Sequence, residues 1–491
     1  MLFNSLEFAF FLPIVFLAYW FGVKQNLKAQ NILLLLASYF FYGWWDLRFL
    51  FLLILLSFLN YLIGIRLDKN ETDKEKKIWL IAGLILNLGI LIVFKFFYFF
   101  IDSFINFVYL FGYHLPKSTT RIILPLGISF YVFLSLSYII DVYKKNLTAN
   151  RNIIEVLLSL SFFPIILAGP IQRPSSLLPQ ISKKREFDYL TAVDGLKQIV
   201  WGLFTKIAIA DKFASYIDNI FLNSSDYSGS TLLIGILLYT IQIYADFSGY
   251  SNIAIGTAKL FGFRLMRNFA YPYFSRDITE FWKRWHISLT TWFRDYVFLP
   301  LSFSVSGRIK NNTIFYIKTD LFIYIVAGTI TWFLTGLWHG ANYTFICWGM
   351  IHCFFLILYH WQQKPRKRLF KKLGITNDHA LVVITETIIT LFIVMIAWIF
   401  FRANSIHQAI KYIDEMISPS LFSVPQVFPV NVSILATLFI FSEWLQRKKE
   451  HALQIDNLKV RIVRWIIYYG VVFLILLTLN DSQQSFIYSQ F

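Results

Sequence analysis

Two histidines in apolar surroundings are the side chains of this sequence best suited to chemistry at neutral pH. The first, His339, stands between Gly336 and Gly340, at a helix break that we expect between two apolar segments. An ionisable side chain inside a membrane bundle is costly, so its presence is by default a functional hypothesis. A neutral imidazole can accept a hydroxyl proton because its pKa lies near the operating pH, which typically contributes about 10²–10⁴-fold in rate. The alternative is a histidine at a loop tip in the lipid headgroup region.

The second histidine, His286, lies in the densest polar motif of the chain, residues 276–296. Interpreted as one helix, this segment has an aromatic face and a charged face, which is typical of a helix at a membrane interface. We expect Thr279 to cap the helix and Glu280 to pair with a cation one turn on. A histidine on the aromatic face is either a hydrogen-bonded packing residue or a functional one. The aromatic face consists of Trp282, Trp285, His286, Leu289, Trp292, Phe293 and Tyr296.

Other polar or amphipathic side chains stand beside these motifs and are candidates to line a substrate tunnel. Asp246 ends a predicted apolar segment, where a charge needs a partner or a wet cavity. Cys347 and Cys353 share one apolar segment, so we expect packing residues rather than a disulfide framework or a zinc site. The candidate lining residues are Trp282, Trp285, Arg284, Trp338, Asp246 and Asn342.

Several common catalytic motifs are missing from the sequence. It has no P-loop, no Rossmann fingerprint, no Gly-x-Ser-x-Gly elbow and no His-Glu-x-x-His zinc motif. We therefore expect no nucleotide hydrolysis, no metal site and no bound cofactor.

The elements that hold these side chains are strongly apolar. Of the 491 residues, 57% are hydrophobic, 19% are aromatic and only 15% are charged. A soluble domain has roughly 45–50% apolar and about 25% charged residues, because its surface must be polar. Lipid removes that requirement, since apolar side chains can then face outward as well as inward. The composition therefore predicts an all-α integral membrane protein.

A helix needs about 20 mostly apolar residues to cross a bilayer, and on this basis we expect about 11–13 transmembrane or re-entrant helices. Because no polar stretch is long enough for a soluble domain, we expect one membrane domain over 1–480 and a tail over 481–491. The predicted segments are 6–22, 30–45, 48–65, 78–101, 122–142, 152–168, 193–210, 231–248, 320–337, 341–361, 381–402, 429–445 and 463–480.

The basic residues indicate topology. The net charge of +17 comes from Lys and Arg in short loops between apolar segments, so we interpret it as a membrane signal and expect no nucleic acid partner. The basic loops Arg66–Lys77, Lys364–Lys372 and Arg447–Arg464 are expected in the cytoplasm. Counting segments from these loops predicts that both termini lie outside. The first apolar segment lacks a basic n-region and a cleavage site, so we expect no cleaved signal peptide.

Taken together, these motifs resemble the membrane-bound O-acyltransferase family, and most closely its bacterial branch with the alginate O-acetyltransferase membrane subunit. The resemblance extends over nearly the whole chain, from Met-Leu-Phe-Asn-Ser-x-x-Phe at the start through Tyr-Ala-Asp-Phe-Ser-Gly-Tyr-Ser. Its most specific matches are Asn268-Phe-x-Tyr-Pro-Tyr-Phe, Phe281-Trp-x-Arg-Trp-His286-Ile-Ser-Leu and Gly336-Leu-Trp-His339-Gly-Ala.

The resemblance implies a helical bundle around a central tunnel or funnel in a bacterial cytoplasmic (inner) membrane. It implies that His339 is the catalytic histidine and that His286 is a second essential polar position. The acyl donor, acetyl-CoA or an acyl carrier protein, would enter from the cytoplasm. The acceptor, a hydroxyl of an exported polysaccharide or cell-wall glycan, would enter from outside.

The tail resembles the Phe-x-Tyr-x-x-Phe ending of proteins in bacterial acyl-export systems, matched here by Phe486, Tyr488 and Phe491. This resemblance implies that Tyr488 carries the acyl group to a periplasmic or extracellular acyltransferase partner; a terminus resting on the membrane surface is the alternative. Two other functions stay open at this point. They are D-alanyl transfer to teichoic acid, and a non-catalytic transporter or scaffold for a periplasmic acetyltransferase.

Overall fold

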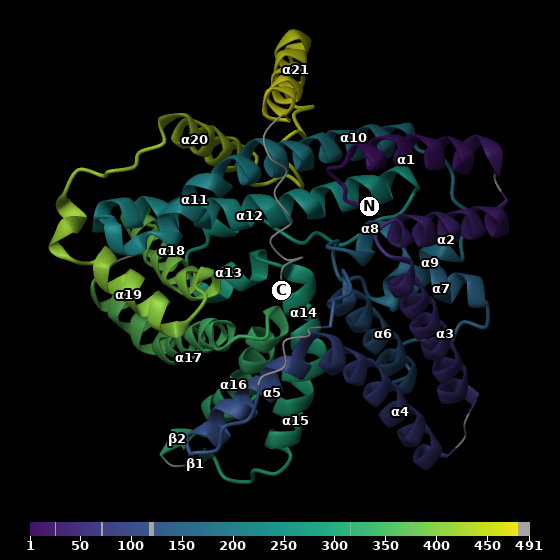
Figure 1. The fold of residues 1–491 in the computed structure, drawn as a ribbon, viewed down its shortest axis with the longest axis horizontal. Helices are drawn as coiled ribbons and strands as arrows, with labels where there is room; N and C mark the ends of the chain where they lie inside the picture. The colour runs from purple at the N-terminus through teal and green to yellow at the C-terminus, as the bar shows by residue number, and fades with distance from the viewer. Residues whose placement is uncertain (25, 70–71, 117–121, 315, 375, 480–491) are drawn as a thin grey trace. The chain divides into compact units, whose positions relative to one another are not determined.

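The computed structural model describes residues 1–491 except 25, 70–71, 117–121, 315, 375 and 480–491. The described residues are mostly helical (Figure 1), with one antiparallel hairpin made of β1 (Thr313–Ile314) and β2 (Ile317–Lys318). The predicted all-α fold is therefore confirmed. The enclosed tunnel and the boundary at residue 480 stay predictions.

The described chain divides into two compact units, and the first comprises Met1–Leu203 and Tyr250–Met266. Its second segment includes the end of the long helix α12 (Gly229–Leu260). Single π-helical turns follow α1 and α4, at Ala18–Gly22 and Ile92–Phe96. The helices of this unit are α1 (Leu6–Leu17), α2 (Leu27–Gly43), α3 (Leu47–Lys69), α4 (Asp73–Leu91), α5 (Phe97–Tyr109), α6 (Ile128–Tyr143), α7 (Ile153–Ser161), α8 (Phe163–Ile166), α9 (Pro174–Ile181) and α10 (Tyr189–Leu203).

Helix α6 is the core element of the first unit, because almost every side chain between its ends is buried. Several polar side chains in this core are paired, which offsets the cost of excluding water from them. Asn60 of α3 and Asn87 of α4 hydrogen-bond each other through their side-chain amides, at 2.8 and 3.2 Å. Ser137 of α6 donates to the carbonyl of Phe133 at 2.7 Å. Amide pairs of this kind hold transmembrane helices together.

The second unit comprises Phe204–Gly249 and Arg267–Phe491. It contains all the histidines and tryptophans singled out above. Its helices, with the first part of α12, are α11 (Lys212–Leu222), α13 (Ile278–Arg284), α14 (Ile287–Phe293), α15 (Leu299–Ser306), α16 (Thr319–His339), α17 (Tyr343–Lys372), α18 (Ala380–Arg402), α19 (Ile406–Met416), α20 (Val430–Leu445) and α21 (Arg461–Thr478). π-helical segments lie at Phe204–Asp211 and Arg294–Phe298, and 3₁₀ turns at Ser224–Asp226, Pro272–Phe274 and Pro419–Phe422.

Helices α16 and α17 form a tightly packed hairpin that holds the candidate site. A Cβ on Gly336 would lie 2.4 Å from the carbonyl oxygen of Phe345, and one on Gly349 would lie 2.4 Å from that of Trp332. Only glycine fits at these two positions. Small residues at facing positions let the backbones of membrane helices approach closely.

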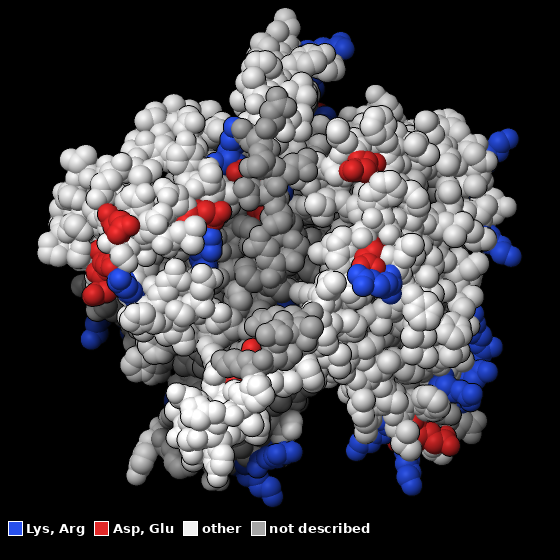
Figure 2. Space-filling model, in the orientation of Figure 1, with Lys and Arg blue, Asp and Glu red and all other residues white. Residues whose placement is uncertain are grey.

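Within the described part of the chain, seven helices are long and apolar enough to cross a membrane, and four shorter apolar helices accompany them. The seven are Leu47–Lys69, Asp73–Tyr109, Gly229–Leu260, Thr319–His339, Tyr343–Lys372, Ala380–Arg402 and Arg461–Thr478. Figure 2 shows the matching surface, which is mostly uncharged on the face drawn, with Lys and Arg in small clusters. The chain is a multi-pass membrane protein.

Candidate active site

His339 is the last residue of α16 and is almost completely buried, with 2% of its surface exposed. The helix ends there because Gly340 adopts an extended conformation, with φ −173° and ψ 156°. The predicted break at Gly340 is confirmed, whereas the predicted break at Gly336 was wrong, since α16 continues through it. His339 is therefore a buried helix end and not an exposed loop tip.

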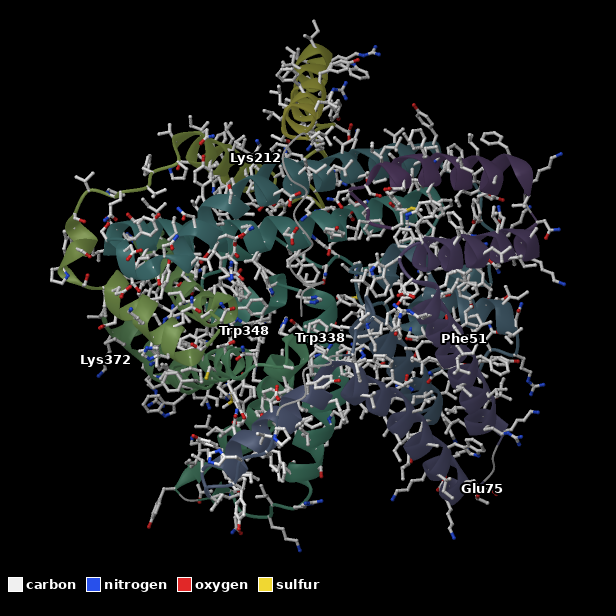
Figure 3. All side chains as sticks on the ribbon, in the orientation of Figure 1. Phe51, Glu75, Lys212, Trp338, Trp348 and Lys372 are labelled. Carbon is white, nitrogen blue, oxygen red and sulfur yellow. The ribbon has the colours of Figure 1, made fainter. Side chains whose placement is uncertain are left out.

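Three aromatic rings from three helices surround the His339 imidazole. They are Trp338 of α16, Trp348 of α17 and Phe401 of α18, with ring centroids 4.8, 4.7 and 5.2 Å from that of the imidazole. Both tryptophans are labelled in Figure 3. This packing fixes the orientation of the imidazole ring before any substrate arrives.

The predicted single helix over 276–296 was wrong, because two short helices, α13 and α14, meet at His286. This residue has left-handed backbone angles, φ 41° and ψ 52°, which a continuous helix cannot accommodate. Such a conformation costs on the order of 1–3 kcal/mol for a residue other than glycine and is concentrated at functional sites. Asp277, and not Thr279, caps α13, by accepting a hydrogen bond from the amide of Glu280 at 2.8 Å.

The hydrogen bonds around His286 determine its tautomer. The Asn268 Oδ1 atom accepts from the Ser288 hydroxyl at 2.9 Å and from the Ser288 amide at 3.3 Å, so it is the oxygen of that side chain. His286 Nδ1 lies 3.0 Å from this same oxygen and must donate to it. Nε2 is then the acceptor nitrogen. His286 is fully buried in the segment between α12 and α16, and burial lowers its pKa to about 3, so the imidazole is neutral.

The structure brings the two histidines against one indole. The ring of Trp338 lies 6.0 Å from that of His286 and 4.8 Å from that of His339. Trp282 and Trp285, two of the predicted lining residues, belong to the same cluster. Trp282 lies 5.7 Å from Trp348, and Trp285 lies 4.9 Å from Trp398.

A cavity of about 330 Å³ lies beside this cluster. Ile287, the neighbour of His286, is one of its lining residues, and Thr335, one turn before His339, is another. Its α16 wall extends from Tyr324 to Thr335, which is about 16 Å at 1.5 Å per residue. Trp282 and Trp332 form apolar walls. The cavity can therefore hold an extended chain that ends near the two histidines.

Two other predicted lining residues are engaged in local structure. Asn342 caps α17 by accepting from the amide of Thr344 at 3.1 Å, and it donates to the carbonyl of Asn404 at 3.0 Å. Arg284 pairs with Glu280 at 2.5 Å, so the predicted pairing of Glu280 with a cation one turn on is confirmed. Neither side chain has a ring contact with the aromatic cluster in the described part of the chain.

Asp246 has the charged partner that its burial requires. The predicted span end at 248 was wrong, because α12 continues to Leu260 and places Asp246 inside the helix. Its carboxylate lies 2.6 Å from the Lys206 ammonium, which also contacts Asp211 at 2.8 Å. The next residue, Phe247, packs against His286 at 4.5 Å between ring centroids. The ion cluster is therefore adjacent in sequence to a residue that packs against His286.

A third buried histidine was not singled out from the sequence. His352 is fully buried on α17, and neither ring nitrogen has a hydrogen-bond partner among the described residues. Its ring lies 4.9 Å from Trp282 and 4.9 Å from Trp348, so it shares the tryptophan that contacts His339. The only sequence signal was its spacing of four residues from Trp348, which on a helix indicates one face.

Residues 142–406 of the chain match the family model of the membrane-bound O-acyltransferase family. The chain belongs to this family. The matched region includes His286, His339, Asp246 and every other proposed site residue except Tyr488.

Two groups of O-acetylating relatives match most of this O-acyltransferase. It is 36% identical to "Probable alginate O-acetylase AlgI" of Pseudomonas aeruginosa over 435 residues, which are 88% of this chain and 78% of the relative. It is 31% identical to the peptidoglycan O-acetyltransferase of Helicobacter pylori over 446 residues, 85% of this chain and 80% of the relative. The teichoic acid D-alanyltransferase of Bacillus subtilis is 28% identical over 250 residues, 50% of this chain and 60% of the relative. The chain is thus an O-acyltransferase enzyme, with acetyl the best-supported group.

Three further predictions concern the tail, a metal site and the two cysteines. Tyr488 and the rest of the tail lie outside the described residues. Within the described residues, no group of three or more His, Cys, Asp or Glu side chains could hold a metal ion. Cys347 and Cys353 are free thiols, and Cys353 is buried, in agreement with a packing role.

Proposed function

We propose that this acyltransferase transfers an acetyl group from a cytoplasmic thioester, acetyl-CoA or an acyl carrier protein, to a hydroxyl of an exported polysaccharide or cell-wall glycan. The main support is the pair of buried histidines that both pack against Trp338. The acetylating relatives match 85–88% of the chain, whereas the D-alanyltransferase matches half of it, which favours acetyl over D-alanyl transfer.

The chemical step follows from the properties of imidazole. His339 removes the proton of a hydroxyl, either the Tyr488 phenol or that of the acceptor itself, while the hydroxyl oxygen attacks the thioester carbonyl carbon. The tetrahedral intermediate collapses by breaking the carbon–sulfur bond, and the proton passes from His339 to the leaving thiolate. Asn268 holds the His286 imidazole so that Nε2 is its acceptor nitrogen. His286 then positions either a reacting hydroxyl or the Trp338 ring against which it packs. No cofactor beyond the donor is needed for this balance.

The cavity beside α16 suits the donor arm. It has apolar walls, it begins one turn from His339, and its α16 wall continues toward Tyr324 and so toward the start of that helix. The charge of the loops assigns this start to the cytoplasm, since Arg308, Lys310 and Lys318 precede it. A thioester arm entering from that side would present its acetyl group at the histidines.

His339→Ala tests the proposal in cells, with glycan-bound acetate as the measurement. We expect O-acetylation to be lost, while His407→Ala, which removes an exposed imidazole on α19, keeps it. Equal expression of both variants in the membrane fraction is the control for folding. O-acetylation that persists in His339→Ala would contradict catalysis by this residue and favour a scaffold for a separate acetyltransferase.

The tail provides a second test of the route outward. Tyr488 is proposed to receive the acetyl group on its phenol oxygen and pass it to a periplasmic or extracellular acyltransferase partner. We expect Tyr488→Phe to abolish glycan acetylation. The membrane protein should then consume the thioester donor only by hydrolysis. If glycan acetylation is unchanged in Tyr488→Phe, the tail serves only as an anchor.

A further inference from the structure

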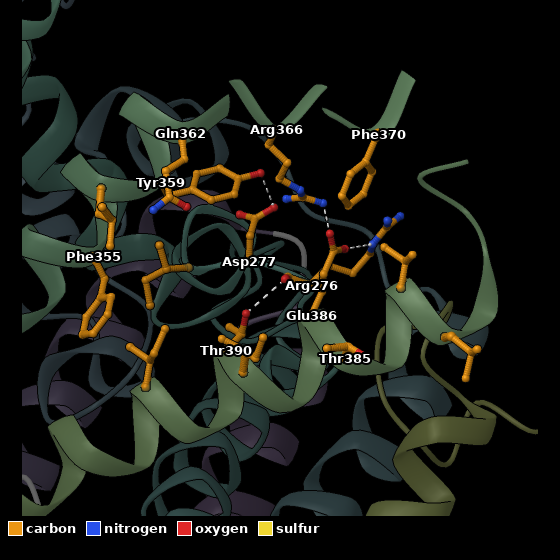
Figure 4. Close-up of a pocket in the computed structure, with 16 residues that line it drawn as sticks. Arg276, Asp277, Phe355, Tyr359, Gln362, Arg366, Phe370, Thr385, Glu386 and Thr390 are labelled. Carbon is orange, nitrogen blue, oxygen red and sulfur yellow. Dashed lines mark hydrogen bonds and ion pairs between the residues drawn. The ribbon is translucent and has the colours of Figure 1, made fainter. Parts of the chain in front are cut away.

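A second cavity, a groove of about 610 Å³, lies between α17 and α18 and is closed at its base by the start of α13. Figure 4 shows its polar end, where Arg276, Arg366 and Glu386 meet. The groove shares no lining residue with the cavity beside His339. The function proposed above does not use it.

The two helix faces that form the groove change from apolar to polar along their length. On α17, Tyr359 follows Phe355 by one turn. Gln362 and Arg366 follow Leu358 by one and two turns. On the antiparallel α18, Ile393 and Ile389 lie beside the apolar part, and Glu386 lies beside Arg366. From Phe355 to Arg366 the groove extends about 16 Å at 1.5 Å per residue. This matches half of a hydrocarbon core that is about 30 Å thick.

Of the two guanidinium groups at the polar end, that of Arg366 has donors to spare. Arg276 pairs with Glu386 at 3.0 Å and with Asp378 at 3.2 Å, and Arg366 pairs with Glu386. The other carboxylate that lines the groove, Asp277, accepts a hydrogen bond from Tyr359 at 2.8 Å. Within the described residues Arg366 has no other ion pair, and it lies over the ring of Phe370 at 4.9 Å. Both guanidinium groups stay about one third exposed, at 29 and 32% of their side chains.

The setting of the groove identifies the kind of ligand. Both of its walls are membrane-spanning helices, and in α18 only 22% of the apolar window is buried. Ile389 is 55% exposed, so the apolar part is open to lipid. Arg366 follows Tyr343 by a length of α17 of about 35 Å, which places it at headgroup depth if Tyr343 lies near the opposite surface.

The basic residues at the end of α17 also favour an anionic lipid. The end of α17, Lys364–Lys372, has six Lys and Arg residues and no acid, and all of the lysines are exposed. Basic clusters directly beside a membrane span on the cytoplasmic side attract anionic lipid headgroups, and basic pockets between such helices bind them. We propose that the groove between α17 and α18 binds an anionic phospholipid. Its headgroup phosphate lies at Arg366 and Arg276, and an acyl chain lies along Leu358, Ile389 and Ile393.

Thermal unfolding of the full-length protein in a neutral detergent tests this site. Added phosphatidylglycerol is expected to raise the midpoint for the wild type, and phosphatidylcholine is not. Arg366→Gln should weaken the apparent affinity for phosphatidylglycerol about five-fold, because a basic residue near the surface contributes about 1 kcal/mol to binding of anionic lipid. Arg366→Lys keeps the charge and should retain most of the shift. Arg308→Gln, an equal loss of charge at an exposed loop, is the matched control.

A second variant separates the lipid from other phosphates. Ile389→Trp fills the apolar part without changing any charge and should also abolish the phosphatidylglycerol shift. Comparing each variant with and without lipid removes effects on intrinsic stability. The proposal is overturned if Arg366→Gln and Ile389→Trp respond to phosphatidylglycerol as the wild type does. It is also overturned if inorganic phosphate shifts the wild type as strongly, or if Arg366→Gln weakens a shift by coenzyme A as much as the phosphatidylglycerol shift, since the groove would then be an anion or donor site.

Discussion

At the scale of single residues, the hydrogen bond between His286 and Asn268 decides which imidazole nitrogen is available to accept a proton. The Ser288 amide and hydroxyl fix Asn268 Oδ1 as an acceptor, and this holds the His286 proton on Nδ1. A buried histidine with a fixed tautomer and a left-handed backbone is a costly arrangement. Its sensitivity to a change at Asn268 can therefore be predicted.

Asn268→Asp should introduce an acidic limb into the pH profile. The carboxylate would lie against Nδ1–H and stabilise the imidazolium, so the pKa of His286 would rise from its present value of about 3. In the wild type this group stays neutral through the working range. In the variant, activity should fall as the pH decreases through the raised pKa. Acetyl transfer by purified protein, measured between about pH 5 and 8, covers the transition.

Asn268→Leu is the matched control, because it removes the hydrogen bond without adding charge. We expect it to lower activity at every pH and to leave the shape of the profile unchanged. Identical profile shapes for Asn268→Asp and Asn268→Leu would contradict the assigned hydrogen bond.

His352 allows a prediction about stability. Its two buried nitrogens have no hydrogen-bond partner among the described residues, and an unsatisfied buried polar group costs about 1–3 kcal/mol. His352→Phe should keep the ring contacts with Trp282 and Trp348 and leave the thermal unfolding midpoint unchanged or higher. A midpoint lowered by several degrees would mean instead that a water or substrate group pairs with the imidazole.

At the scale of elements, the hairpin of α16 and α17 positions His339. Gly349→Ala should destabilise the protein by about 1–3 kcal/mol and reduce activity, because the added Cβ would lie 2.4 Å from the Trp332 carbonyl and separate the two helices. Gly328→Ala on α16 is the control, since its Cβ would meet only the Cys353 sulfur at 3.9 Å. Thermal unfolding and acetyl transfer measure both effects. Equal behaviour of the two variants would contradict the close packing of this hairpin.

The ion cluster of Lys206, Asp211 and Asp246 predicts an unequal response to two neutralising substitutions. Lys206→Met leaves Asp211 and Asp246 buried without their shared cation, and breaking a buried pair in this way costs about 3–5 kcal/mol. Asp246→Asn keeps Lys206 paired with Asp211 and should cost less. Combining Asp211→Asn and Asp246→Asn with Lys206→Met should recover part of the loss. Thermal unfolding measures the loss of stability in each variant. An Asp246→Asn variant that is less stable than Lys206→Met would contradict the prediction.

At the scale of the whole molecule, the direction of transfer depends on topology. The loop charges predict that residues 376–379 lie in the cytoplasm and that the Lys- and Arg-poor segment between α18 and α20 lies outside. A reporter that is active only outside the cytoplasm should therefore be active when inserted at residues 423–428 and inactive at residues 376–379. Activity at both positions or the reverse pattern would contradict the outward route.

Much of the fold follows from local sequence properties. Span length, apolar composition and the positions of the basic loops depend on neighbouring residues, so the all-α membrane fold and the segments around α3, α16, α17 and α18 could be predicted. The motifs around His286 and His339 could also be found in the sequence, because a histidine among apolar residues is a local pattern that does not depend on tertiary packing.

Tertiary structure alone decided how those motifs meet. The left-handed break at His286 depends on its pairing with Asn268, and the shared contact of both histidines with Trp338 depends on how separate helices pack. The same holds for Lys206 beside Asp246 and for the burial of His352. The sequence by itself determined which residues could do chemistry inside a membrane. Only the packing of the helices decided which of them lie together, since contacts between distant segments have no local signature.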